Sequence, residues 1–167
     1  MKTQSRGLCV LGLGNPILTD DGAGIRTVEL VQEDRARFAG DIPVNFRTLC
    51  IGGYDLLYEV EGYDALLVVD AFFSTESVPG HVRFLQGDDL ISGDAAPPSA
   101  HMLNLPSALR MGRKLGYRTP NLIGVVAIEV GETCQDFGES LTPEVSSAVP
   151  IAAEMVSKLV TDYISKC

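Results

Sequence analysis

Three aspartates and one histidine stand at positions that packing alone does not explain. Asp20 and Asp21 follow the glycine-rich segment that begins at Gly12. Asp70 closes the most apolar run of the chain, and His101 comes just before an expected helix. Aspartate is rarely buried unless it is paired or ligating. Two carboxylates and one imidazole, from Asp21, Asp70 and His101, suit a divalent ion such as zinc or nickel with an open position for water or a substrate group.

Each candidate also has a purely structural interpretation. Asp70 could cap a backbone turn. Asp20 could cap the helix expected to start near Gly22, or it could act as a general base or as a partner that orients a ligand. His101 carries little signal when taken alone. His81, the other histidine, alternates with apolar residues in an expected edge strand, so we expect it to face solvent.

The elements that must position these residues follow from the apolar pattern, which alternates between strand-like and helix-like segments. We expect strands over residues 8–13, 44–49, 65–71, 80–86 and 122–130, and helices over 22–38, 54–60, 105–115 and 143–164. This alternation predicts an α/β fold with a mostly parallel sheet covered on both faces. Ligands of such sheets bind beyond the carboxyl ends of the strands, so we expect the three aspartates on one rim. Residues 87–103 are expected to form a long functional loop.

Composition limits the class of protein. The chain has 167 residues, of which 46% are apolar, so we expect one globular domain over residues 1–167. No apolar run reaches the roughly 18 residues of a membrane span, and the first residues do not resemble a signal peptide. We therefore expect a cytoplasmic protein that binds no membrane. The net charge of -9 argues against a nucleic-acid partner and is compatible with a monomer. Cys9 and Cys50 are expected to be buried free thiols.

The motifs and their order resemble those of the nickel–iron hydrogenase maturation endopeptidases. The similar segments are GLGNPILTDDGAG, the strand ending in Val69-Asp70-Ala71, Ser99-Ala100-His101, and the stretch from Leu122 to Glu129 with Ser140 to Val145 after it. The resemblance spans nearly the whole chain. It implies a three-layer α/β/α sandwich around a twisted, mostly parallel, five-stranded sheet. It also implies an endopeptidase that removes the C-terminal extension of a hydrogenase large-subunit precursor after nickel insertion, cutting after His or Arg.

The resemblance further implies a ligand set. Family members carry Glu or Asp at the position of Asp21, Asp at that of Asp70 and His at that of His101, and these residues bind the metal. Two mechanisms fit: a resident divalent ion such as zinc that activates water, or recognition of nickel already held by the precursor, which we favour. The chain departs from the family after its second strand. Many members have Asp-Gly-Gly there, whereas this chain has residues 47–51 as RTLCI and Gly52-Gly53 slightly later.

Other classes of protein share parts of this pattern. Peptidyl-tRNA hydrolases also open with a strand and GLGNPG, but here Ile17 replaces the last glycine, their Thr-Arg-His-Asn stretch is absent, and the chain is acidic. A nucleotide-binding Rossmann module needs a third glycine at Ile17, and Asp20 and Asp21 would repel a pyrophosphate. A non-catalytic, metal-dependent chaperone of the large subunit stays open, because a protease that binds its substrate through a metal resembles such a chaperone.

Overall fold

Five strands form one sheet at the centre of the molecule. The computed structural model describes residues 7–50, 52, 54–73, 76–86, 105–132 and 136–166. The strand order is β2-β1-β3-β5-β4; β4 is antiparallel to β5 and the other neighbouring pairs are parallel. The mostly parallel sheet and the edge position of the fourth strand are therefore confirmed. The strands are β1 (Leu8–Leu13), β2 (Val44–Leu49), β3 (Ala65–Phe72), β4 (Val82–Gln86) and β5 (Leu122–Glu129).

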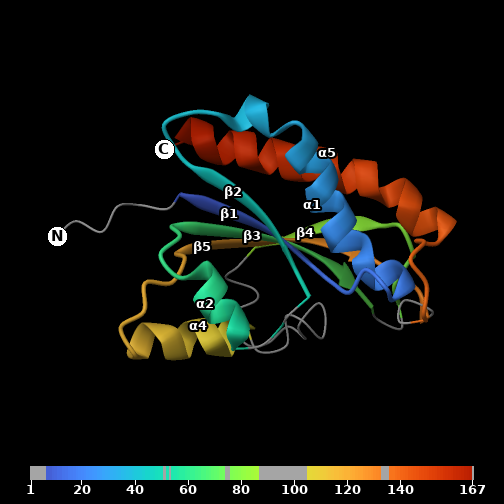
Figure 1. Cartoon of the computed structure of the whole chain (residues 1–167), viewed down its shortest axis with the longest axis horizontal. Coiled ribbons are helices and arrows are strands. Elements are labelled where there is room, and N and C mark those ends of the chain that lie inside the picture. The colour runs from blue at the N-terminus through green and yellow to red at the C-terminus, as the bar shows by residue number, and fades with distance from the viewer. Residues whose placement is uncertain are drawn as a thin grey trace.

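Helices cover both faces of this sheet (Figure 1). Two of them, α1 and α5, pack on one face, and α2 and α4 pack on the other. The arrangement is the expected α/β/α sandwich. The helices are α1 (Ala23–Glu33), α2 (Asp55–Val60), α4 (Leu105–Lys114) and α5 (Pro143–Lys166), with the short 3₁₀ helices η1 (Thr19–Gly22) and η2 (Arg35–Phe38) on either side of α1.

Alternating side chains of the central strands fill two apolar cores. On β3, Leu67 and Val69 enter the core beneath α1 and α5, whereas Leu66 and Val68 enter the core beneath α2 and α4. A strand covered by helices on both faces reads as a continuous apolar run, which explains the sequence of β3. Because side chains alternate with a period of two, Asp70 belongs to the face that α2 and α4 cover.

Two expectations are wrong. The segment expected as one helix over residues 22–38 divides into α1 and η2, because Asp34 leaves the helical conformation between them with φ -104 and ψ 27. Cys50 is exposed and not buried, since it directly follows β2, a strand at the edge of the sheet. Cys9 is buried in β1, and His81 is exposed, as expected.

Among the described helices, none combines the length and the apolar character that a membrane span requires. The cytoplasmic location, the monomeric state and the single domain over residues 1–167 stay predictions.

Glycines allow α1 to begin directly against the ends of β1 and β3. A Cβ on Gly24 would lie 2.3 Å from the carbonyl oxygen of Val69 and 2.5 Å from that of Leu13. A Cβ on Gly12 would lie 2.7 Å from the carbonyl oxygen of Gly24. Real Cβ atoms do not approach backbone oxygens so closely, so helix and strands meet backbone to backbone. This contact brings η1, the turn just before α1, to the carboxyl edge of the sheet.

We expect Gly24→Ala to lower the free energy of unfolding by at least about 2 kcal/mol, because the added methyl group clashes with two carbonyl oxygens. The clash should outweigh the better helix propensity of alanine. Gly40→Ala is the matched control, since nothing lies within 4 Å of a Cβ at that position. Urea unfolding followed by circular dichroism measures both variants. Equal stabilities would contradict the close packing of α1.

Candidate functional site

The candidate aspartates lie at one edge of the sheet. Strands β1 and β3 run parallel with Gly12 opposite Val69, so both end at the same edge. The turn η1, which carries Asp20 and Asp21, follows β1 and contacts β3. Asp70 is the residue after Val69. The common rim expected from the sequence is therefore present at the carboxyl edge.

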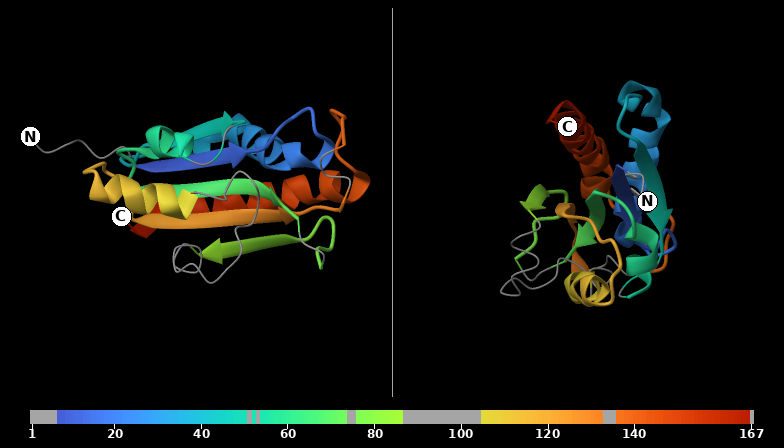
Figure 2. Two further views of the ribbon diagram at one scale, coloured as in Figure 1. Left: turned by 90° about the horizontal axis from the view of Figure 1, so that it is seen from below. Right: turned by 90° about the vertical axis from the view of Figure 1, so that its left-hand side faces the viewer.

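Asp70 is completely buried. Its Oδ1 accepts a hydrogen bond of 2.9 Å from the backbone N–H of Ala71. Helix α4 packs on the same face of the sheet as Asp70 and runs antiparallel to β5 (Figure 2). His101 precedes Leu105 by four positions and lies outside the described residues, as does the loop expected over residues 87–103.

Asp21 is held in place by the glycine turn. Its Oδ2 accepts a hydrogen bond of 2.7 Å from the backbone N–H of Asn15. Gly14 has φ +142, and a Cβ there would lie 1.9 Å from the carbonyl oxygen of Asp21. Only glycine tolerates both conditions. The turn thus fixes the backbone of Asp21, and its partly buried carboxylate, at the end of β1.

Asp20 is bound by a residue from a distant part of the chain. Its carboxylate is 1% exposed and binds Thr142, the residue before α5. The backbone N–H of Thr142 donates to Oδ1 at 2.7 Å, and its hydroxyl donates to Oδ2 at 2.9 Å. The helix α1 receives no side-chain cap. Asp20 therefore joins η1 to the start of α5, which explains its burial without any role in chemistry and leaves Asp21 as the candidate ligand of the pair.

A short backbone ladder fixes the loop beside η1. The N–H of Thr19 donates to the carbonyl of Gly138 at 2.7 Å, and the N–H of Gly138 donates to the carbonyl of Ile17 at 3.0 Å. The Thr19 hydroxyl also donates to the carbonyl of Asp136 at 2.5 Å. Thr19 has φ +30, in the left-handed region that a β-branched residue rarely adopts. Such a conformation persists only where surrounding contacts enforce it, as they do here.

A charged cluster near Asp70 was missed by the sequence analysis. Glu129 ends β5 and is 5% exposed; its Oε1 lies 2.7 Å from Nε of Arg83, and its Oε2 accepts a 2.7 Å bond from the N–H of Val78. The Arg83 guanidinium lies 4.9 Å from the ring centroid of Phe72. In the sheet register, Arg83 and Asp70 occupy one row, two strands apart. A carboxylate that follows a run of apolar residues in a buried strand, as Asp70 does in β3, was the available signal for Glu129 in β5.

The described residues supply part of the expected ligand set. Within them, no group of three His, Cys, Asp or Glu side chains is arranged to hold a metal ion. Asp21 and Asp70 fit a divalent cation in donor type, and a backbone N–H orients each carboxylate. The imidazole would have to come from His101. The set of Asp21, Asp70 and His101 stays a prediction.

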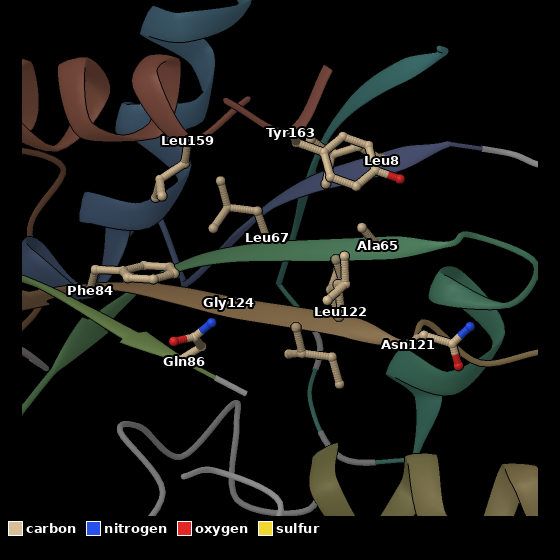
Figure 3. A pocket seen from close by; sticks show the side chains of 12 residues that line it. Leu8, Ala65, Leu67, Phe84, Gln86, Asn121, Leu122, Gly124, Leu159 and Tyr163 are labelled. Atoms are coloured by element: carbon tan, nitrogen blue, oxygen red, sulfur yellow. The ribbon is translucent and has the colours of Figure 1, made fainter. Parts of the chain in front are cut away.

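An apolar cavity of about 180 Å³ lies at the other end of the sheet (Figure 3). Its lining includes Leu8, Ala65 and Leu122, which are the first residues of three parallel strands, together with Leu159 and Tyr163 of α5. The amino ends of these parallel strands lie at one edge of the sheet, and their carboxyl ends lie at the opposite edge. The cavity is therefore separate from the candidate aspartates.

Comparisons with known proteins identify the family. A family model described as hydrogenase maturation protease matches residues 48–159. The chain is 33% identical over 156 residues to the hydrogenase expression/formation protein HupD of Rhodobacter capsulatus, an alignment that covers 90% of this chain and 70% of that protein. The chain belongs to the hydrogenase maturation protease family. It is therefore a peptidase.

Other relatives agree in sequence and in fold. The protease is 28% identical to the hydrogenase 2 maturation protease of Escherichia coli K12, over 89% of this chain and 87% of that one. The solved structure of the hydrogenase maturating endopeptidase HybD from E. coli matches with a TM-score of 0.74 and 26% identity, over 93% of each chain. The [NiFe] hydrogenase maturation protease HybD from Thermococcus kodakarensis matches with a TM-score of 0.68 and 25% identity, over 92% of this chain and 99% of that chain.

The link between Asp20 and Thr142 predicts a specific loss of stability. We expect Thr142→Val to lower the free energy of unfolding by about 1–3 kcal/mol, because it leaves the buried Oδ2 of Asp20 without its hydroxyl donor. Thr142→Ser should restore most of this loss. Thr161→Val, which removes an exposed hydroxyl within α5, is the control and should change stability by less than about 0.5 kcal/mol. Thermal and urea unfolding measure the series; similar losses at both threonines would contradict the proposed link.

Proposed function

We propose that this protease removes the C-terminal extension from the large-subunit precursor of a nickel–iron hydrogenase after nickel has been inserted. Membership of the hydrogenase maturation protease family supports the reaction class. The observation that carries the site assignment is the presence of Asp21 and Asp70 at one edge of the sheet, each oriented by a backbone N–H. This edge is where α/β sheets bind their ligands.

We further propose that Asp21, Asp70 and His101 recognise nickel carried by the precursor. Two carboxylates and an imidazole are donors that a divalent first-row metal accepts. Because this set contains no cysteine thiolate, its affinity for a free metal ion should be only moderate. The metal would then be bound chiefly when the substrate brings it to the site. Binding to the metal would hold the tail in one orientation, and proximity of this kind accelerates a subsequent cleavage. Nickel loading would then act as the checkpoint for processing.

The burial of Asp70 supports an interaction with a cation. A carboxylate that is completely buried has already lost its hydration in the folded protein. Its attraction to a metal ion is then weakened less by water than that of an exposed carboxylate. The alternative with the same residues is a resident divalent ion such as zinc, which would lower the pKa of a bound water and polarise the scissile carbonyl.

We expect Asp21→Asn, Asp70→Asn and His101→Ala each to reduce processing of a nickel-loaded precursor by at least about 100-fold. Loss of residues that merely orient metal ligands already costs about 10- to 100-fold. Mass spectrometry of the precursor before and after incubation measures the reaction, and circular dichroism confirms folding. Asp41→Asn, at an exposed position, is the control and should process normally. A near-normal rate for any of the three variants would remove that residue from the site.

Nickel dependence separates the two metal mechanisms. We expect a precursor prepared without nickel to stay uncut, because the proposed site then has no metal to recognise. Zinc added to the protease should not restore cleavage. If zinc does restore it, the resident-ion alternative is correct. If the nickel-loaded precursor binds the wild-type protein but keeps its full mass, the chain acts as the non-catalytic chaperone considered above.

A further inference from the structure

Two large apolar side chains stand exposed beside η1. Phe137 is 88% exposed and Ile17 is 50% exposed. Neither belongs to a helix or a strand, so neither completes the apolar stripe of an amphipathic element. Surface loops tolerate polar residues freely, and burial does not require an apolar residue at either position. Their presence therefore calls for an explanation outside the packing of this chain.

These side chains are exposed on a fixed backbone. The two bonds of Gly138, which accepts from Thr19 at 2.7 Å and donates to Ile17 at 3.0 Å, tie together the loops that carry Ile17 and Phe137. Leu18 also forms a β-bridge with Gly138. A side chain on such a backbone loses little freedom when a partner covers it, so the arrangement is organised in advance for binding.

Two further apolar residues are exposed at the same end of the molecule. Phe73 directly follows β3 and is 45% exposed, and Val78 precedes β4 and is 64% exposed. Figures 1 and 2 both show the ends of β1, β3 and β5 and the start of β4 at one end of the sheet. We call Ile17, Phe73, Val78 and Phe137 the apolar rim. It lies at the edge that carries Asp21.

We propose that the apolar rim is the docking surface for the folded body of the protein substrate, to which the tail to be cut is attached. This inference rests on the proposed function. The rim lies at the same edge of the sheet as the candidate site, and Ile17 belongs to the turn that leads from β1 to Asp21. Exposed apolar groups bounded by polar residues are typical of protein–protein contacts. In this arrangement Asp21 and Asp70 hold the tail through its metal, and the apolar rim binds the surface of the substrate from which the tail emerges.

Charge favours this occupant over a second copy of the chain. The protein carries a formal net charge of -9, so two copies that meet at the rim would repel each other. A substrate surface suited to the rim is apolar at its centre and neutral or basic around it.

The test uses a double variant that carries both Ile17→Ala and Phe137→Ala. Its control is the single variant Leu115→Ala. Leu115 is 67% exposed and lies in the turn after α4, near the amino edge of the sheet, so it matches the rim residues in exposure but not in place. With nickel-loaded precursor, we expect the double variant to raise KM about tenfold or more, a size typical of central contact residues. Its kcat at saturating precursor should stay within twofold of wild type. Leu115→Ala should change neither value.

Isothermal calorimetry with precursor prepared without nickel, which we expect to stay uncut, adds a measurement that does not depend on cleavage. The dissociation constant of the precursor should be higher for the double variant than for the wild type, as its KM is. Leu115→Ala should leave this constant unchanged. A KM within twofold of wild type, an equal effect of Leu115→Ala, or a fall in kcat alone would overturn the docking role. A dimer in sedimentation experiments that the double variant abolishes would assign the rim to a second copy instead. If the wild-type protein leaves the precursor uncut, the proposed function fails, and the calorimetric comparison still decides the rim.

Discussion

At Gly24, the first turn of α1 meets the carbonyl oxygens of Leu13 and Val69 with no side chain between them. This backbone contact fixes the distance between the helix and the two central strands. The turn η1 must then reverse the chain within a few residues, which is why Gly14 presses against the backbone of Asp21. The absence of a side chain at Gly14 and Gly24 therefore sets the position of the Asp21 backbone, and the N–H of Asn15 orients its carboxylate.

A second set of contacts joins loops that are far apart in sequence. Asp20 binds Thr142 across a separation of 122 residues. The two backbone hydrogen bonds of Gly138 join the same two regions of the chain. Together they make the end of β1, the loop after β5 and the start of α5 one unit. Buried charge-assisted hydrogen bonds of this kind are costly to break, because the remaining partner stays buried. These hydrogen bonds therefore hold three described segments together at the edge where we propose that a substrate binds.

The regular elements were predictable because burial imposes its period on the sequence. The bounds of β1 and β2 agree with expectation residue for residue, and α5 begins at Pro143, the first residue of the helix expected there. Parallel topology alone predicted the common edge of Asp21 and Asp70. The partner of Asp20 and the pairing of Glu129 with Arg83 were not predictable, because each depends on a contact between distant segments. The contribution of His101 rests on the resemblance to the family.

The direction of β4 has a consequence for how this fold can change. The connection from Phe72 to Val82 starts and ends at the carboxyl edge, because β4 runs opposite to β3. Two strands that meet at one edge do not need the crossover connection that joins parallel strands. An insertion in this connection should cost little free energy, because the entropy of closing a loop grows slowly with its length. Divergence among enzymes of this architecture can therefore proceed by changing loop length at the carboxyl edge, with no need for compensating changes in the interior.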